Sequence, residues 1–174
     1  MLVLASGRGD RFTASGGTGS KLHAFLGGKP VLERTLDTVR ASGLPWHLED
    51  AGHEGMGDSI AAAVRATPGA SGWLVLPGDL PLVGPGTLRA VAAALVTHTV
   101  AVPHYKGQRG HPVGFAASCR EALLMLNGPQ GAALVVRARP LETVTHLELD
   151  DPGIVTDIDT LADLAAAERL LATR

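Results

Sequence analysis

The sequence predicts an α/β protein whose central sheet is mostly parallel. The segments Leu2–Ala5 and Trp73–Leu76 are continuously apolar, as expected for strands that are buried on both faces of a sheet. Each is followed by a turn that contains glycine, and stretches with helical spacing alternate with the apolar runs. Because the chain has 174 residues, we expect one domain over residues 1–174.

Local start and stop signals predict the remaining elements. Pro30 and Gly43 bound a stretch with apolar residues at helical spacing, since proline is favoured at a helix start and glycine just past its end. Pro85 opens another helix, and an alanine-rich helix from Ile60 ends before Pro68. Further strands are predicted at 46–48, 100–102, 113–115 and 144–149, with helices at 121–126 and 164–171.

The composition limits the classes of partner. With a formal net charge of −2 and no basic patch, nothing favours binding to nucleic acid or to a lipid surface. No apolar stretch approaches the ~20 residues of a membrane span, and the N-terminus lacks the charged segment of a secretion signal. A single cysteine, Cys119, cannot form an internal disulfide. We therefore expect a cytoplasmic protein.

The turn after the first strand is a candidate phosphate site. Ser6–Arg11 combines two glycines with two arginines, and Lys21 adds positive charge at the end of the next loop. Glycine lets backbone N–H groups approach a phosphate closely, although many glycine turns are merely turns. The spacing excludes two better-known sites, because Phe12 stands where a dinucleotide fingerprint needs glycine and Gly19–Lys21 reverses the order of a P-loop.

Asp79 is a candidate magnesium ligand. It follows the strand Trp73–Leu76, and open α/β sheets bind ligands at the carboxyl ends of their strands. A carboxylate facing a nucleotide phosphate suits Mg²⁺, which takes few protein ligands. The alternative is an aspartate that holds the turn between Pro77 and Pro81.

Two further segments carry candidate ligands. Gly55–Ser59 precedes a helix, so its free N–H groups could hold a phosphate or a base edge, while Asp58 or Ser59 could equally be a plain N-cap. Asp157 and Asp159 alternate along an extended segment and should face one site, where a second carboxylate near Asp79 would complete a magnesium site. Thr160 and Asp163 have the spacing of a capping box.

The segment His104–Pro112 is polar and has too many special residues for a simple hairpin, so we expect a substrate-facing loop. His111 beside Pro112 is interpreted as a hydrogen-bonded turn histidine rather than a catalytic base. The seven histidines are scattered without a His-x-x-x-His pair, which argues against a zinc site.

Six blocks in a fixed order carry a resemblance to a known family. They are Leu4–Arg11, Lys21–Leu22 with Leu26–Pro30, Gly55–Ile60, Pro77–Pro81, Gly107–Pro112 and Asp157–Thr160. With these blocks the chain resembles the MobA-like nucleotidyltransferases, and most closely the molybdenum cofactor cytidylyltransferases. The resemblance implies a Rossmann-like three-layer α/β/α sandwich of the nucleotide-diphospho-sugar transferase type, with Mg²⁺ as cofactor.

The resemblance also implies the activity and its residues. A nucleotidyl group, CMP by the likeness of Gly55–Ser59, would pass from a nucleoside triphosphate to a molybdopterin-type phosphate with release of pyrophosphate. A molybdoenzyme or its maturation chaperone is an implied partner. By position, Arg11, Lys21 and Asp79 would serve catalysis, Asp79, Asp159 and Asp157 the metal, and Arg109 and His111 the acceptor; the nucleotide-binding set is Ala5, Ser6, Gly7, Arg8, Gly9, Lys21, Gly57, Asp58 and Ser59.

The chain departs from the family pattern in three places. Thr13–Gly19 is inserted before Lys21, only 43–54 remain where a strand and a helix usually stand, and Gly128–Gly131 lacks the family's aspartate. The loop Phe12–Ser20 should be mobile without nucleotide, because it has little apolar surface to bury; it is either a lid or a passive insertion. Two alternatives stay open: an NAD(P)H-dependent oxidoreductase of the nicotine-blue type, and a nucleotide-binding protein that has lost catalysis.

Overall fold

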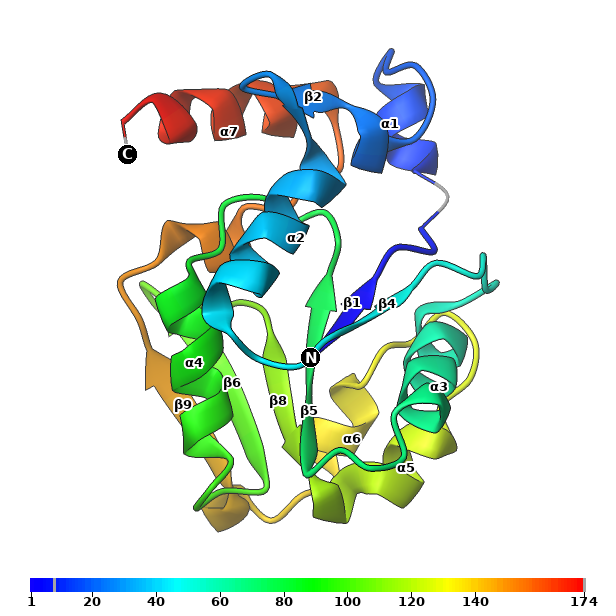
Figure 1. The fold of residues 1–174 in the computed structure, drawn as a ribbon, viewed down its shortest axis with the longest axis vertical. Coiled ribbons are helices and arrows are strands. Elements are labelled where there is room, and N and C mark those ends of the chain that lie inside the picture. The colour runs from blue at the N-terminus through cyan, green and yellow to red at the C-terminus, as the bar shows by residue number, and fades with distance from the viewer. Residues whose placement is uncertain (8, 174) are drawn as a thin grey trace.

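A mixed sheet forms the centre of the protein in the computed structural model, which describes residues 1–7 and 9–173 (Figure 1). Seven strands of the described chain form it, in the order β4-β1-β5-β8-β6-β7, with β9 on the free side of β6. They are β1 Leu2–Leu4, β4 His47–Glu49, β5 Gly72–Pro77, β6 Val100–Tyr105, β7 Gln108–Arg109, β8 Val113–Ala116 and β9 Val144–Glu148.

The predicted parallel character of the sheet is confirmed. β4 and β5 flank β1 in parallel, and β9 runs parallel to β6. β8 is antiparallel to both β5 and β6 and separates the two parallel groups. The three-residue β4 forms one edge, as expected from the short segment 43–54.

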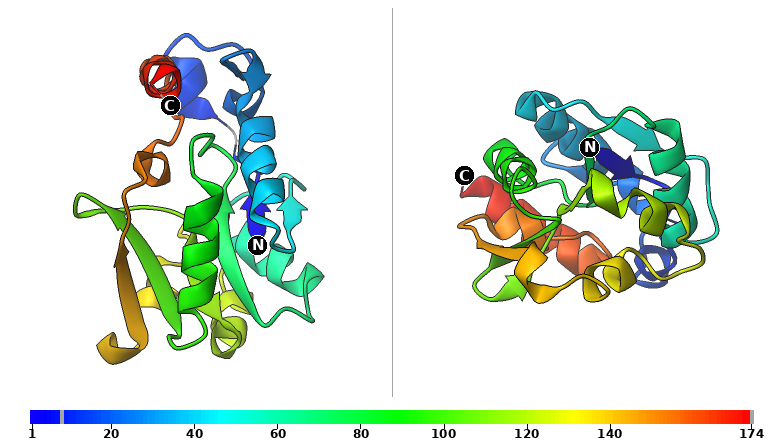
Figure 2. Two further views of the ribbon diagram at one scale, coloured as in Figure 1. Left: turned by 60° about the vertical axis from the view of Figure 1, so that its left-hand side comes forward. Right: turned by 90° about the horizontal axis from the view of Figure 1, so that it is seen from below.

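Helices cover both faces of this sheet (Figure 2). They are α1 Asp10–Ala14, α2 Val31–Ser42, α3 Met56–Ala66, α4 Pro85–Ala94, α5 Arg120–Leu124, α6 Ala133–Arg137 and α7 Leu161–Ala172. Trp73 and Val75 pack against α3, α5 and α6, whereas Leu74 and Leu76 pack against α2 and α4. Because successive side chains of β5 enter opposite cores, the whole strand is apolar, which is why its sequence identifies it as central.

A small layer of α1, α7 and the β2–β3 hairpin (Phe25–Leu26 and Lys29–Pro30) lies beyond the carboxyl ends of β1 and β5 (Figure 1). Its own apolar cluster joins Phe12, Leu26 and Ile158, which come from distant parts of the chain. This cluster holds the C-terminal segment against the segment that follows β1.

The expectation for residues 12–20 is wrong in its physical premise. The segment starts within α1, and Phe12 is only 2% exposed in the core. Ser15 Oγ accepts a hydrogen bond from the N–H of Leu161 at 3.1 Å, which ties the end of α1 to the start of α7. One buried aromatic ring supplies the apolar surface that the glycine and serine content conceals.

The expectation that 104–112 is too irregular for a simple hairpin is wrong for its first half. β6 continues to Tyr105, which pairs with Gln108 across the two-residue turn Lys106–Gly107. Both turn residues have positive φ, 50° and 77°, the backbone of the tight turn that normally carries Asn-Gly. Lysine in the first position hides this signal. Helix α6 was not predicted either.

The other predicted elements are present, with ends shifted by a few residues. Gly43 ends α2 in the left-handed conformation, and Pro85 opens α4. The buried Cys119 immediately precedes α5. Among the residues described, none of the helices is long and apolar enough to span a membrane.

Candidate functional site

A cavity of about 630 Å³ opens at the carboxyl ends of β1, β4 and β5. Most of the residues predicted for function line it, although they come from six separate segments of the sequence. They are Ser6, Gly7, Gly9, Arg11, Lys21, Ser59, Asp79, Arg109, His111, Asp157 and Asp159. The sheet therefore brings together what the sequence spreads over more than 150 residues.

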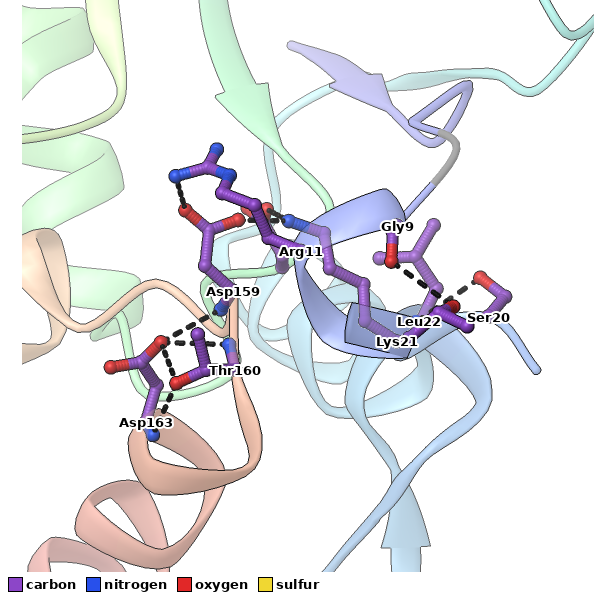
Figure 3. Close-up of polar contacts among 10 residues, drawn as sticks. Gly9, Arg11, Ser20, Lys21, Leu22, Asp159, Thr160 and Asp163 are labelled. Carbon is purple, nitrogen blue, oxygen red and sulfur yellow. Dashed lines mark hydrogen bonds and ion pairs between the residues drawn. The ribbon is translucent and has the colours of Figure 1, made fainter. Parts of the chain in front are cut away.

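Lys21 is the centre of the charged cluster in this cavity (Figure 3). Its Nζ lies 2.6 Å from Asp79 Oδ2 and 2.6 Å from Asp159 Oδ1, so one ammonium bridges two carboxylates. All three side chains are largely buried. Burial acts to lower the pKa of Lys21, but the charges and hydrogen bonds of Asp79 and Asp159 outweigh it and raise the pKa above its usual value.

The other charges of the cluster are more exposed. Arg11 Nη1 contacts Asp159 Oδ2 at 2.5 Å, but the Arg11 side chain is 76% exposed, so solvent and salt weaken that pair. Asp157 faces the same cavity while Ile158 between the two aspartates is buried, which confirms the expected alternation. Desolvation, together with the negative charges of Asp79 and Asp159, raises the pKa of Asp157.

Backbone contacts fix the segments that carry these side chains. The N–H of Ala5 donates to the carbonyl of Glu49 at 2.8 Å, and the N–H of Gly78 donates to the carbonyl of Leu4 at 2.8 Å. Gly9 precedes α1 with φ of 70°, a conformation that favours glycine. Ala5 packs in the core instead of lining the cavity, and Arg8, predicted for the same phosphate turn, lies outside the described residues.

The start of α3 forms another wall, but only part of it faces the cavity. Ser59 lines the cavity, whereas Gly57 and Asp58 do not. The N–H of Gly57 donates to the carbonyl of Gly128, and Asp58 Oδ2 accepts from the N–H of Gly128 at 3.0 Å. The helix is capped by Gly55, so the alternative of Asp58 or Ser59 as N-cap is wrong. Asp58 instead fastens α3 to the loop before α6.

Arg109 and His111 form the side of the cavity beside β7. Burial lowers the pKa of His111, so its imidazole is neutral at pH 7. Its Nδ1 is buried without a hydrogen-bond partner among the described residues, whereas a hydrogen bond between the ring and the backbone of Val75 acts to raise the pKa, in keeping with the hydrogen-bonded histidine that we expected. Burial, followed by the charge of Arg137, lowers the pKa of Arg109. A neutral hydrogen-bonding ring and a cation thus face the same space.

Sequence reasoning missed a second polar cluster at the end of β4. The buried Glu49 contacts His53 Nε2 at 3.0 Å and His47 Nε2 at 3.4 Å, and it accepts from the N–H of Ala51. His53 lines the cavity. The signal was present, because Glu49 directly follows the strand predicted at 46–48, but this carboxylate was not weighed as Asp79 was.

The carboxylates fit a divalent metal, although no cluster of three or more metal-binding side chains occurs in the described chain. Asp79 Oδ1 is buried and has no hydrogen-bond partner among the described residues. A buried carboxylate oxygen without a donor is suited to a cation. Mg²⁺ is commonly held by one or two carboxylates, with phosphate oxygens and water completing its shell. Asp79 and Asp159 satisfy that requirement.

Comparison with known families assigns the chain to one of them. The family model described as the MobA-like NTP transferase domain matches residues 38–144. The chain belongs to this family. Its members are nucleotidyltransferases, and the α/β/α architecture found here is the one expected for them. No curated protein matches the sequence.

Solved structures of similar fold cover almost the whole chain. A nucleotidyl transferase from Methanothermobacter thermautotrophicus is 22% identical with a TM-score of 0.81, covering 99% of this chain and 97% of its own. Rv0371c of Mycobacterium tuberculosis, in complex with manganese, is 23% identical with a TM-score of 0.74, over 97% and 96%. The 2-C-methyl-D-erythritol 4-phosphate cytidylyltransferase of Thermus thermophilus is 20% identical with a TM-score of 0.70, over 99% and 98%. At these identities the likeness establishes the fold.

Proposed function

We propose that this protein transfers CMP from CTP to a molybdopterin-type phosphate acceptor, with Mg²⁺ as cofactor and release of pyrophosphate. The observation that carries the proposal is the pair Asp79 and Asp159 facing Lys21 in a cavity bordered by the glycine turn after β1. The family, the manganese complex of Rv0371c and the cytidylyltransferase from Thermus thermophilus support it.

The reaction asks the protein for position and charge. An oxygen of the acceptor phosphate attacks the α-phosphorus of CTP, a new P–O bond forms, and the bond to the β-phosphate oxygen breaks as pyrophosphate leaves. Lys21 and Arg11 neutralise the triphosphate, and the N–H groups of the turn after β1 orient it. Held by Asp79 and Asp159, the metal would supply charge neutralisation at the phosphate oxygens. No covalent enzyme intermediate is needed.

The two substrates would use opposite sides of the cavity. Gly55, Met56 and Ser59 at the start of α3 offer a surface for the base. The choice of CTP follows the likeness of this block to the cytidine-selecting one. Arg109 and His111 border the acceptor side, where a cation and a neutral imidazole suit an anionic, hydrogen-bonding molecule such as a pterin phosphate.

The test is release of pyrophosphate. The protein is incubated with Mg²⁺, molybdopterin and each nucleoside triphosphate in turn, and the mass of the product is measured by mass spectrometry. We expect pyrophosphate and a CMP adduct with CTP. Preference for GTP would overturn the nucleotide assignment, binding without pyrophosphate would indicate a protein that has lost catalysis, and oxidation of NADH in a parallel assay would favour the oxidoreductase alternative.

Asp79→Asn is the decisive variant. It keeps the shape of the side chain and removes the charge that would hold the metal, so the fold should persist while metal-dependent turnover is lost. Asp150→Asn is the matched control, because Asp150 is exposed and does not line the cavity. Activity of Asp79→Asn close to that of the control would contradict the metal assignment.

A further inference from the structure

The ammonium of Lys21 stands between two carboxylates that fit a metal. Its Nζ is 2.6 Å from an oxygen of Asp79. It is also 2.6 Å from an oxygen of Asp159 (Figure 3). Only 11% of the Lys21 side chain is exposed, so this ion pair is weakly screened by solvent. The positive charge of Lys21 thereby neutralises the two carboxylates, as a metal ion bound by them would.

The second oxygens of the two carboxylates leave little room for a divalent ion beside Lys21. Asp159 uses its second oxygen to contact Arg11, and Asp79 keeps only the buried Oδ1 without a partner. A divalent ion that approached both carboxylates would meet the positive charge of Lys21 at close range, where like charges repel strongly. A metal and the ammonium therefore cannot both occupy the space between these oxygens.

We propose that Lys21 fills the divalent-metal position in the free protein, and that the metal enters only with a triphosphate, whose oxygens then receive the displaced ammonium. The inference rests on the proposed function for the nature of the nucleotide. Lysine suits the exchange, because its flexible four-carbon stem can turn a point charge from one set of anionic oxygens to another.

Two consequences follow from this exchange. Metal alone binds weakly, because it must leave a buried ammonium without a partner, whereas a metal triphosphate supplies a cation for the carboxylates and oxygens for Lys21. Removal of the Lys21 charge should therefore tighten metal binding without nucleotide. If Lys21 instead helped to bind the metal or to orient the two carboxylates, its removal would weaken metal binding.

The experiment measures Mn²⁺ binding without nucleotide, by electron paramagnetic resonance and by calorimetry. We expect Lys21→Met to bind Mn²⁺ at least ~10-fold more tightly than the wild type, about the value of one hydrogen bond to a charged group. Lys29→Met is the control, because Lys29 forms an exposed pair with Asp37, and it should bind as the wild type does. Equal or weaker binding by Lys21→Met would overturn the exchange.

Two further variants test where Mn²⁺ binds and whether Lys21→Met is still folded. Adding Asp79→Asn to Lys21→Met should abolish the gain, and a gain that survives would place the metal elsewhere and overturn the inference. Lys21→Gln keeps a hydrogen-bonding end group and is measured in parallel, with the same gain expected. Mn²⁺ should also raise the melting temperature of both neutral variants more than that of the wild type, because a ligand stabilises the state that binds it.

The outcome is independent of turnover. If Lys21→Met binds Mn²⁺ more tightly while the wild type releases no pyrophosphate, the exchange is upheld and the proposed function is contradicted. If the wild type transfers the cytidylyl group but Lys21→Met binds Mn²⁺ no more tightly than the wild type, the proposed function is upheld and the exchange is contradicted.

Discussion

The backbone N–H of Ile158 donates a 3.0 Å hydrogen bond to the carbonyl oxygen of Asp79. This contact joins the end of β5 to the segment before α7. Ile158 is buried in the small apolar cluster, so the aspartates on either side of it turn toward the cavity. Packing of Ile158 therefore positions the carboxylate of Asp159, which contacts Lys21.

Asp159 and Thr160 should separate function from stability. Thr160, and not Asp159, caps α7: its side chain accepts from the N–H of Asp163, whose carboxylate accepts in return from the N–H of Thr160. Thr160→Ala should cost ~1 kcal/mol of stability, the usual value of a cap, with turnover retained. Asp159→Asn should lose turnover and keep the cap. Melting curves and pyrophosphate release for both variants decide this, and the reverse pattern would contradict the assignment.

Phe12 should matter more for stability than its glycine-rich surroundings indicate. Because the ring is buried in the cluster with Leu26 and Ile158, Phe12→Ala should lower the free energy of unfolding by ~3–5 kcal/mol. Phe25→Ala is the control, since Phe25 is 64% exposed, and it should be close to neutral. Urea titration measures both, and equal midpoints would show that α1 does not anchor this layer.

The lid expected over residues 12–20 stays a prediction, with a different anchor. The hydrogen bond from Leu161 to Ser15 and the buried Phe12 hold one end of the segment in place. Closure over a triphosphate would therefore be limited to the residues between Ser15 and Lys21. Hydrogen exchange should show added amide protection in that window when CTP and Mg²⁺ are present, and no change there would leave a passive insertion.

Stability should fall in acid through Glu49. Burial acts to raise the pKa of Glu49, but its hydrogen bonds with His47, His53 and the N–H of Ala51 outweigh burial and lower the pKa below the ordinary value of 4.5. The folded state therefore binds this proton less readily than the unfolded chain. The contribution is complete above pH 4.5 and is lost as the pH falls through the folded pKa.

Melting temperatures of the wild type and Glu49→Gln test this pH dependence. The gap between the two proteins should be widest above pH 4.5 and should close as the pH falls through the lowered pKa of Glu49, where the wild-type carboxylate also becomes neutral. Asp50→Asn, in an exposed neighbour, serves as the control. A gap that is constant over the whole range would mean that Glu49 acts by shape and not by charge.

Much of this protein could be predicted from the sequence because the relevant forces are local. The apolar run Trp73–Leu76 indicates a strand buried on both faces, and the caps at Gly43 and Thr160 depend only on nearby residues. The position of Asp79 at a strand end follows from the same reading. These features establish the α/β sandwich and one end of the cavity without knowledge of any distant contact.

Only the tertiary structure decided which side chains meet. Lys21 and Asp159 are 138 residues apart, and their contact depends on the docking of α7 beside α1 through Phe12 and Ile158. The same is true of Asp58, which local pattern offered as a cap or ligand and packing assigned to Gly128. Periodicity and capping report on the chain within a few turns, whereas contacts across the fold arise from burial of apolar surfaces that no local pattern pairs.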